Sequence, residues 1–407
     1  MGSQPHLAAT QLEDPATADA GKATSPATAT PLISVVIPCL NEAQSIAECV
    51  RRAQDVLDRN GFTGEIVVAD NGSTDGSPEA AEAAGARVVH EWRTGYGSAY
   101  LAGFAAANGT YIVMADADLT YDFDDIPRFV DQLEDGADFV IGNRMKNIRP
   151  GAMPWHHRYI GNPALTGALN LFFRTGVRDA HCGMRAVRRD ALPGLDLRAT
   201  GMEFASEMVV RAAKEDLDIR QIPIAYAPRA GESKLSSFRD GWRHLRFLLV
   251  HSPTYLFLIP GALMTVSGAL IIVAVLSNLS VFGRPWQLHT MIAGTLITVV
   301  GTQVLALGCA ARAYGVWYLG ERDPAFSRIE RRLRLEYGLL AGTAVLLVGL
   351  GILIYIAAKW LSSGAGALAE TRLALLAATL VIVGLQITFS SFLLSILGLR
   401  RDDSAAQ

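Results

Sequence analysis

Four long segments without a charged side chain constrain the fold of this chain more than any other feature. They run approximately over 253–276, 288–311, 338–358 and 373–398. Each holds about 20 or more residues, enough to cross ~30 Å of hydrocarbon at a rise of ~1.5 Å per residue. Buried helices of soluble proteins seldom run so long without charge. The sequence therefore predicts four transmembrane helices over 253–398.

Positive residues in the connecting loops give the expected orientation. Between the second and third segments lie Arg312, Arg322, Arg328, Arg331, Arg332 and Arg334. The first loop has only Arg284, and Arg400 and Arg401 follow the fourth segment. Because positive residues mark the cytoplasmic side, the N-terminal half, the second loop and the C-terminus are expected there. The predicted location is the cytoplasmic membrane, crossed several times.

The four segments are interpreted as an anchor. None contains a charged residue, whereas pumps and proton-coupled transporters usually need charge within the membrane. Flat membrane anchors often associate with copies of themselves, so a homo-oligomer stays open.

A basic amphipathic helix is expected at 236–252, just before the first span. Phe238 and Trp242 fall on one face of this helix, and Arg239 and Arg243 lie on its flanks. A helix of this kind lies in the headgroup plane of a bilayer. We therefore expect it to rest on the membrane surface.

Composition excludes several classes of protein. The net charge of −3 gives no nucleic-acid signature, so no nucleic-acid partner is expected. The four cysteines form no CxxC pair, which favours free thiols over a disulfide framework or a zinc site. Residues 1–31, rich in Ala, Thr and Pro, lack the apolar core of a signal peptide and are expected to be disordered.

Residues 32 to about 145 alternate between strand-like and helix-like stretches. The short apolar runs are "LISVVI", "EIVVAD", "ARVVH", "TYIVMA" and "ADFVIG". Strands separated by helices predict an α/β domain with a mostly parallel sheet and right-handed crossovers. Ligands of such sheets bind at the carboxyl ends of the strands. Polar clusters stand there: "CLNEA", "DNGSTDGS" and "DADLTYD".

Two common nucleotide-binding folds are disfavoured. A dinucleotide-binding dehydrogenase needs GxGxxG directly after its first strand, but Pro38, Cys39, Leu40, Asn41 and Glu42 stand there. A P-loop ATPase is disfavoured because GxxxxGK[ST] is absent.

The acid pair Asp116 and Asp118 follows the fourth predicted strand with one residue between them. Carboxylates in this arrangement suit Mg²⁺ or Mn²⁺, which prefer oxygen ligands and bridge to substrate phosphates. Asp122, Asp124 and Asp125 are interpreted as a polar loop and the first turn of a helix, where acids favour the helix dipole.

With these motifs in order, the chain from about 33 to 234 resembles a family 2 glycosyltransferase with the GT-A fold. "VVIPCLNEAQSI", "VVADNGSTDGS" and "MADADLTYD" match successive motifs of that family. "GNRM", "DAHCGMRA", "RAGESKL" and the C-terminal membrane domain resemble its polyprenyl-phosphate (dolichol-phosphate) branch. The implied parts are a disordered tail (1–31), a cytoplasmic GT-A catalytic domain (32–235), an interfacial helix (236–252), four transmembrane helices (253–398) and a cytoplasmic tail (399–407).

The resemblance implies a donor site and a metal site. The nucleotide sugar would be held by Pro38, Asn41, Glu42, Asp70 and Asp116. The metal, Mg²⁺ or Mn²⁺, would be held by Asp116, Asp118 and Thr120. The family often has Gln where this chain has Thr120, and many relatives carry Gly-Lys-Gly where it has Gly95-Tyr96-Gly97.

The resemblance also implies a site for the phosphate of a lipid acceptor. Its expected residues are Arg144, Arg158, Asn162, Arg229 and Lys234. Arginine offers a planar fork that suits phosphate oxygens, and Arg144 is expected to act in catalysis with Asp116 and Asp118. Asp179, Arg185 and Glu203 are interpreted as shaping this pocket. "WHHRYIGNPALTGALNLFFR" is expected to form a second interfacial helix, with His156 and His157 exposed or facing headgroups rather than binding metal.

The implied reaction is inverting transfer of a hexose or N-acetylhexosamine from a nucleotide sugar to polyprenyl phosphate. "GYGSAYLAGF" with "DADLTYDF" looks closer to relatives that use UDP-sugars, and a GDP-mannose-dependent polyprenyl-phosphate mannose synthase is the alternative. A processive polysaccharide synthase is disfavoured because no QxxRW-type motif precedes the spans. From another class, a non-catalytic membrane scaffold would not need an intact Asp116/Asp118 pair.

Overall fold

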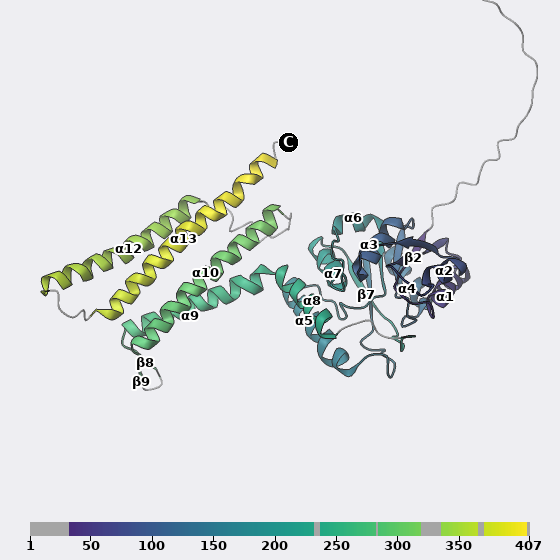
Figure 1. Ribbon diagram of the computed structural model, residues 1–407, viewed down its shortest axis with the longest axis horizontal. Helices are drawn as coiled ribbons and strands as arrows, with labels where there is room; N and C mark the ends of the chain where they lie inside the picture. The colour runs from purple at the N-terminus through teal and green to yellow at the C-terminus, as the bar shows by residue number, and fades with distance from the viewer. Residues whose placement is uncertain (1–31, 232–236, 282–283, 319–334, 365–369, 405–407) are drawn as a thin grey trace, which may run out of the picture.

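The computed structural model describes residues 32–231, 237–281, 284–318, 335–364 and 370–404. The predictions for residues 1–31 and for Lys234 lie outside these residues. An α/β domain forms one end of the molecule and a group of long helices forms the other (Figure 1).

Seven strands form one sheet in the order β3-β2-β1-β4-β6-β5-β7. They are β1 (Ile33–Cys39), β2 (Gly64–Asp70), β3 (Arg87–His90), β4 (Tyr111–Met114), β5 (Phe139–Asn143), β6 (Arg185–Arg188) and β7 (Ile219–Pro223). The strand β6 pairs antiparallel with both β4 and β5, and the other pairs are parallel. The mostly parallel sheet and its first five strands are as predicted, whereas β6 and β7 were not foreseen.

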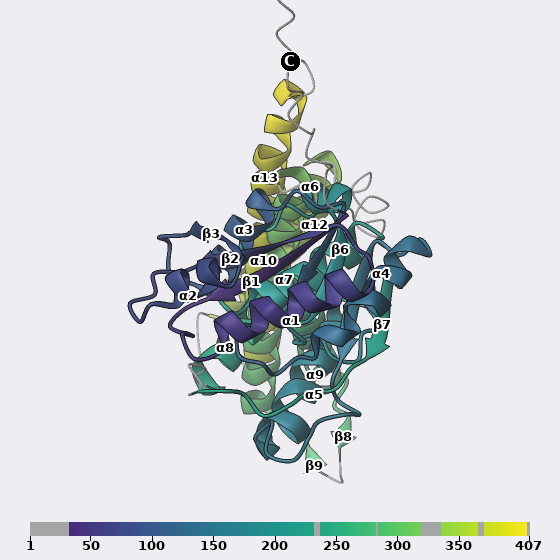
Figure 2. The ribbon, with the colours of Figure 1, turned by 90° about the vertical axis from the view of Figure 1, so that its right-hand side faces the viewer.

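Helices connect the strands and cover both faces of the sheet. They are α1 (Ile46–Arg59), α2 (Ser77–Ala83), α3 (Tyr96–Ala106), α4 (Ile126–Glu134), α5 (Asn162–Phe173), α6 (Leu192–Leu195) and α7 (Phe204–Lys214). Figure 2 shows α1 lying across the sheet. In β1, the consecutive residues Val35, Val36 and Ile37 are fully buried, because a parallel strand covered on both faces must be apolar on both sides.

Among the described residues, four helices are long and apolar enough to cross a bilayer, which confirms the prediction. They are α9 (Ile259–Leu276) with the preceding turn η4 (Thr254–Leu258), α10 (Leu288–Tyr318), α12 (Leu335–Ser362) and α13 (Thr371–Ser404). The short strands β8 (Ser280–Val281) and β9 (Arg284–Pro285) join α9 to α10. Arg312, expected in a loop, lies on α10 and donates a 2.8 Å hydrogen bond to Thr254 Oγ1.

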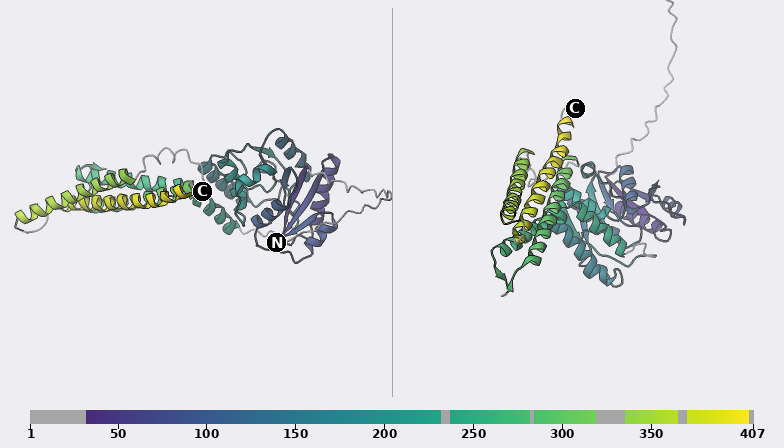
Figure 3. Two further views of the ribbon diagram at one scale, coloured as in Figure 1. Left: turned by 90° about the horizontal axis from the view of Figure 1, so that it is seen from above. Right: turned by 60° about the vertical axis from the view of Figure 1, so that its left-hand side comes forward.

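The four membrane helices pack in the order α9, α10, α13, α12, and they extend away from the α/β domain as a narrow layer (Figure 3). Glycines set the close approach of neighbouring helices. A Cβ added at Gly268 of α9 would lie 2.6 Å from the backbone nitrogen of Thr298 on α10. Small residues at such crossings stabilise helix pairs in lipid, where the hydrophobic effect does not drive association.

Helix α8 (Ser237–Val250) joins the two parts and packs against α5 and α7. It buries Asp240, His244 and Leu248 against the α/β domain, and it leaves Phe238 and Trp242 exposed. Phe238 and Trp242, which the sequence places on the apolar face of this helix, therefore point away from the α/β domain. The inward face carries polar side chains, which hydropathy alone does not indicate.

Candidate active site

The predicted polar clusters meet at the carboxyl edge of the sheet. The backbone nitrogen of Asn71, after β2, donates to the carbonyl of Cys39 at the end of β1 (2.8 Å). Pro38 is partly exposed next to this edge. Since β4 pairs with β1 in parallel, Asp116 follows its strand at the same edge. The structure thus brings together the ends of three strands that lie far apart in sequence.

The loop after β4 holds Asp118 in a fixed orientation. Both the backbone nitrogen and the hydroxyl of Thr120 donate to Asp118 Oδ1, at 3.1 and 2.6 Å. Leu119 between them has a φ of 60°, a conformation that bulky residues rarely adopt and that often marks functional sites. Thr120 is therefore a direct partner of Asp118, while its role toward a metal stays a prediction.

Two tyrosines of α3 hold Asp116. The Tyr96 hydroxyl donates to Asp116 Oδ1 at 3.0 Å, and the Tyr100 hydroxyl lies 3.4 Å from the same atom. Burial, and then the charge of Asp118, raise the pKa of Asp116 to about 6. Neither tyrosine was among the predicted site residues. Tyr96 is the middle residue of the Gly95-Tyr96-Gly97 motif, and it contacts Asp116 of the acid pair.

The glycines flanking Tyr96 serve close packing of the chain. A Cβ at Gly95 would lie 2.1 Å from the carbonyl oxygen of Thr200, and a Cβ at Gly97 would lie 2.1 Å from that of Ala199. Only glycine lets the start of α3 approach this backbone. The Gly-Tyr-Gly motif therefore fixes where the Tyr96 hydroxyl points.

Arg229 connects the donor residues with the expected acceptor residues. Its Nη2 atom lies 3.0 Å from Glu42 Oε1, and its Nη1 atom lies 3.7 Å from Asp118 Oδ2. The chain around it runs beside the acid loop: Ala227 donates its backbone N–H to the carbonyl of Thr120, and Ala230 donates to that of Asp118. The predicted acceptor residue thus contacts the predicted donor and metal residues.

The donor set suits a divalent cation. Two carboxylates stand close enough for one to raise the pKa of the other, and such repulsion is relieved by a positive ion. Within the described ranges, no group of three or more His, Cys, Asp or Glu gathers as a metal site. Mg²⁺ is commonly bound by one or two carboxylates together with substrate phosphates, so Asp116 and Asp118 fit an ion that arrives with a diphosphate.

Asp70, expected to hold the nucleotide, is almost fully buried at the end of β2. It accepts backbone N–H bonds from Gly72 and Ser73 (3.2 Å each) and lies 3.2 Å from Nδ1 of His90. Asn41, with a φ of 52°, accepts from the backbone nitrogen of the neighbouring loop at Thr74 (2.8 Å). Both residues hold loops in place, and their contact with a nucleotide stays a prediction.

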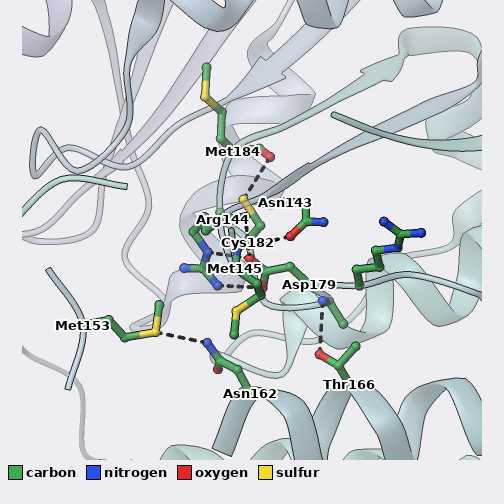
Figure 4. Close-up of polar contacts among 12 residues, drawn as sticks. Asn143, Arg144, Met145, Met153, Asn162, Thr166, Asp179, Cys182 and Met184 are labelled. Carbon is green, nitrogen blue, oxygen red and sulfur yellow. Dashed lines mark hydrogen bonds and ion pairs between the residues drawn. The ribbon is translucent and has the colours of Figure 1, made fainter. Parts of the chain in front are cut away.

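Arg144, expected to act in catalysis, forms a buried two-pronged ion pair. Its Nε and Nη2 atoms donate to the two carboxylate oxygens of Asp179 at 2.8 and 2.9 Å (Figure 4). It also lies over the ring of Tyr226, 5.0 Å from the ring centroid. Burial would raise the pKa of Asp179, but the charge and hydrogen bonds of Arg144 outweigh burial and lower it. Direct contact of Arg144 with a phosphate stays a prediction.

Two further predicted acceptor residues lie on the segment formed by the π-helical turn η2 (His157–Gly161) and α5. Arg158 stacks over Tyr159 at 5.3 Å. The amide of Asn162 lies 3.6 Å from the sulfur of Met153 and points toward it (Figure 4). The predicted acceptor set is thus divided, with Arg229 at the acids and these two residues on a separate element.

Other predictions near the site have clear outcomes. Asp122 caps the short 3-10 turn η1 (Phe123–Asp125) by accepting the N–H of Asp124, and Asp125 pairs with Arg128. These acids begin a helix, as predicted. The four cysteines are free, as predicted.

Arg185 is fully buried and holds three backbone carbonyls. It donates to those of Cys182, Ala205 and Ala180 at 2.7–2.8 Å. It thereby ties the "DAHCGMRA" loop to the start of α7. Its proposed influence on the acceptor pocket would act through this loop.

A buried contact between the α/β domain and α8 was not predicted. Ser206 Oγ lies 2.8 Å from Nδ1 of His244 and 3.3 Å from Nε2 of His181, and the two imidazole rings are 4.5 Å apart. Burial lowers the pKa of His244 to about 4 and that of His181 well below its usual value. Both histidines are therefore neutral at pH 7. These histidines are recognised by their burial in the structure, and the hydropathy of the sequence does not indicate that burial.

Two family models match parts of this chain. The family described as "Glycosyl transferase family 2" matches residues 34–195, and "Glycosyltransferase family 2 C-terminal transmembrane region" matches residues 309–398. The structure of glucosyl-3-phosphoglycerate synthase from Mycobacterium tuberculosis with Mn²⁺, UDP and glucosyl-3-phosphoglycerate aligns with a TM-score of 0.45 at 25% identity. It covers 55% of this chain and 80% of that one.

Three relatives with curated names are similar to this chain. The undecaprenyl-phosphate 4-deoxy-4-formamido-L-arabinose transferase of Pseudomonas paraeruginosa is 31% identical over 74% of this chain and 91% of its own length. The dolichyl-phosphate hexose transferase of Haloferax volcanii is 35% identical over 51% of this chain and 89% of its own length. The low-salt glycan biosynthesis hexosyltransferase Agl6 of Haloferax volcanii is 44% identical over 90% of this chain and 89% of its own length. The chain therefore belongs to glycosyltransferase family 2 and is a membrane enzyme of that family.

Proposed function

We propose that the enzyme transfers a hexose or N-acetylhexosamine from a nucleotide sugar, preferably a UDP-sugar, to polyprenyl phosphate. The contact of Arg229 with Glu42 and Asp118 carries the proposal. It puts a cation suited to an acceptor phosphate beside acids suited to a donor diphosphate. Two relatives are named after dolichyl phosphate and undecaprenyl phosphate, and these names support a lipid acceptor.

The proposed reaction is a direct displacement that inverts the anomeric centre. An oxygen of the polyprenyl phosphate attacks the anomeric carbon, the bond from that carbon to the diphosphate oxygen breaks, and the nucleoside diphosphate leaves with the electron pair. A phosphate monoester has its second pKa at about 6, so it is mostly dianionic at pH 7. The reaction therefore needs no strong general base, and orienting the two substrates supplies much of the rate.

The residues have distinct proposed tasks. Glu42 and Asp70 orient the nucleotide, while Asp116 and Asp118, with Thr120 beside them, hold Mg²⁺ or Mn²⁺. When bound, this ion offsets the negative charge that develops on the leaving diphosphate. Arg229, Arg144, Arg158, Asn162 and Lys234 are proposed to serve the acceptor phosphate, directly or by shaping its pocket.

The proposed acceptor reaches the site along the membrane surface. Four aromatic side chains on α8, on η2 and just before η2 are exposed: Trp155 (68%), Tyr159 (67%), Phe238 (89%) and Trp242 (55%). Aromatic residues of this kind settle at the level of lipid headgroups. In the sequence, arginines are concentrated between the second and third spans, and positive residues mark the cytoplasmic side, so the catalytic domain is proposed to face the cytoplasm. A homo-oligomer in the membrane is compatible with this arrangement.

The test uses membranes that contain the full chain, polyprenyl phosphate and a panel of radiolabelled UDP- and GDP-sugars with Mn²⁺. The expected result is labelled lipid from a UDP-sugar, lost in Asp118→Ala and retained in Asp124→Asn. Asp124 is an exposed acid of the same stretch that pairs with Arg59 on the surface, so it is a matched control. Transfer from GDP-mannose alone would replace the UDP-sugar proposal. Absence of both transfer and Mn²⁺-linked nucleotide binding would favour a scaffold.

A further inference from the structure

The guanidinium of Arg229 stands where positive charge is needed before any substrate arrives. It contacts Glu42 at 3.0 Å and Asp118 at 3.7 Å, and its side chain is 24% exposed. Asp116 precedes Asp118 by two residues on the same loop. Acids that are meant to hold a cation repel each other when it is absent. A protein cation among them reduces that repulsion.

The backbone, rather than the flexible side chain alone, places Arg229 there. Ala227 and Ala230 each donate an N–H to the acid loop, to the carbonyls of Thr120 and Asp118, both at 2.9 Å. Arg229, one of the two residues between them, therefore projects from a segment of chain that is fixed beside Asp118. The proximity of Arg229 to the acids is thus part of the fold.

One atom of the guanidinium group remains unsatisfied in this position. Among the described residues, Nε of Arg229 is buried without a hydrogen-bond partner. A buried donor without a partner costs free energy, more so in a charged group. The observed contact therefore uses only part of the hydrogen-bonding capacity of Arg229, and an anionic group with several oxygens would use more of it.

We propose that Arg229 is the internal counter-cation of the acid site, and that it moves from Asp118 to the acceptor phosphate once the donor binds. This inference rests on the proposed function. Arg229 leaves Asp118 when a divalent ion occupies the carboxylate, because two positive groups at one carboxylate repel. Its planar fork then faces a phosphate. Donor binding therefore precedes productive acceptor binding.

The inference predicts that Arg229→Gln strengthens the binding of Mn²⁺ and UDP but weakens the use of the acceptor. In Arg229→Gln, Mn²⁺ and UDP no longer compete with a resident cation, so they should bind about three- to tenfold more tightly, the range of a partly exposed charged contact. The same variant lacks the fork for the acceptor, so its KM for polyprenyl phosphate should rise. Damage to the fold would instead weaken both.

The experiment uses the purified full chain in detergent without acceptor lipid. Mn²⁺ binding is followed by electron paramagnetic resonance and UDP binding by calorimetry, so neither readout depends on turnover. Arg229→Lys keeps the charge and should retain the wild-type Mn²⁺ affinity. Arg158→Gln removes a predicted acceptor arginine that stacks on Tyr159, so it should leave the Mn²⁺ affinity unchanged.

A second measurement tests the order of binding. Farnesyl phosphate, a short polyprenyl phosphate, should bind the wild type more tightly when Mn²⁺ and UDP are present, and Arg229→Gln should lose this coupling. Unchanged or weaker Mn²⁺ binding in Arg229→Gln, with normal binding in the wild type, would overturn the inference and leave the proposed function standing. Lack of Mn²⁺ binding in the wild type and in every variant would overturn both.

Discussion

Gly183 lies directly against Asp116. A Cβ added at Gly183 would stand 2.5 Å from Oδ2 of Asp116 and 3.0 Å from the hydroxyl of Tyr121. The Gly183 N–H already donates to that hydroxyl at 2.7 Å. The acid at the end of β4 is therefore confined from above by the loop that precedes β6, and this loop is held by Arg185.

This contact makes Gly183→Ala a sensitive test of the acid pair. The added methyl group forces Asp116 away from its two tyrosine donors, so we expect transfer activity to fall by about tenfold or more, as when one electrostatic group of an active site is misplaced. Steady-state transfer with varied Mn²⁺ measures the loss, which should appear partly as a higher Mn²⁺ requirement. Gly194→Ala, where an added Cβ meets nothing within 4 Å, should retain activity. Equal activity of the two variants would contradict the prediction.

The buried pair of Arg144 and Asp179 predicts a strongly non-additive pattern of stability. Each residue is 6% exposed or less, so removing one partner leaves an unpaired buried charge. Asp179→Ala should reduce the free energy of unfolding by about 3–5 kcal/mol. The double variant Arg144→Met/Asp179→Ala should lose less than the sum of the single variants. Thermal unfolding in detergent measures this cycle, and additive losses would show that the two side chains do not act as a pair.

His244 predicts a pH dependence of stability. Its side chain faces His181, Glu203, Arg185 and Asp240, and its folded pKa of about 4 lies below the ordinary value of 6.5. The unfolded chain therefore takes up this proton first as the pH falls. Neutral His244 contributes its full stability above pH 6.5, and up to about 3 kcal/mol is lost as the pH falls toward 4.

The measurement for this pair of histidines is the melting temperature between pH 7.5 and 5. His244→Gln should flatten the fall in melting temperature seen in the wild type, because an amide does not titrate. His156→Gln changes an exposed histidine and should leave the slope as it is. An unchanged slope in His244→Gln would mean that other groups cause the acid sensitivity.

Apolar runs in the sequence predicted the first five strands, whereas the arginines of β6 kept that strand from being predicted. β6 reads "RAVR", and its first residue is a fully buried arginine whose three hydrogen bonds go to backbone carbonyls. Hydropathy scores such a residue as exposed. The insertion of β6 between β4 and β5, antiparallel to both, therefore could not be read from a pattern of alternating strands and helices.

The acid pair was predictable and its surroundings were not. Asp116 and Asp118 could be recognised in the sequence because they directly follow an apolar strand. Their partners come from distant elements: Tyr96 from α3, Gly183 from the loop before β6, and Arg229 from the segment after β7. Contacts across such separations depend on how elements pack, which periodicity along the chain does not encode.

Substitutions on the outer face of α8, which carries Phe238 and Trp242, should impair the use of a lipid acceptor without lowering the stability of the fold. Phe238 and Trp242 are exposed in the protein, so Phe238→Ser/Trp242→Ser removes little internal packing and should leave the melting temperature in detergent unchanged. In vesicles the same variant loses apolar area that would insert among headgroups, so its KM for polyprenyl phosphate should rise. Leu248→Ala, on the fully buried face of the same helix, is the matched control and should lower the free energy of unfolding by about 2–5 kcal/mol. If the double serine variant lowers the melting temperature as far as Leu248→Ala does, these aromatic residues contribute to the packing of the protein itself. If the acceptor KM in vesicles is unchanged, α8 does not contact the lipid acceptor on its way to the site.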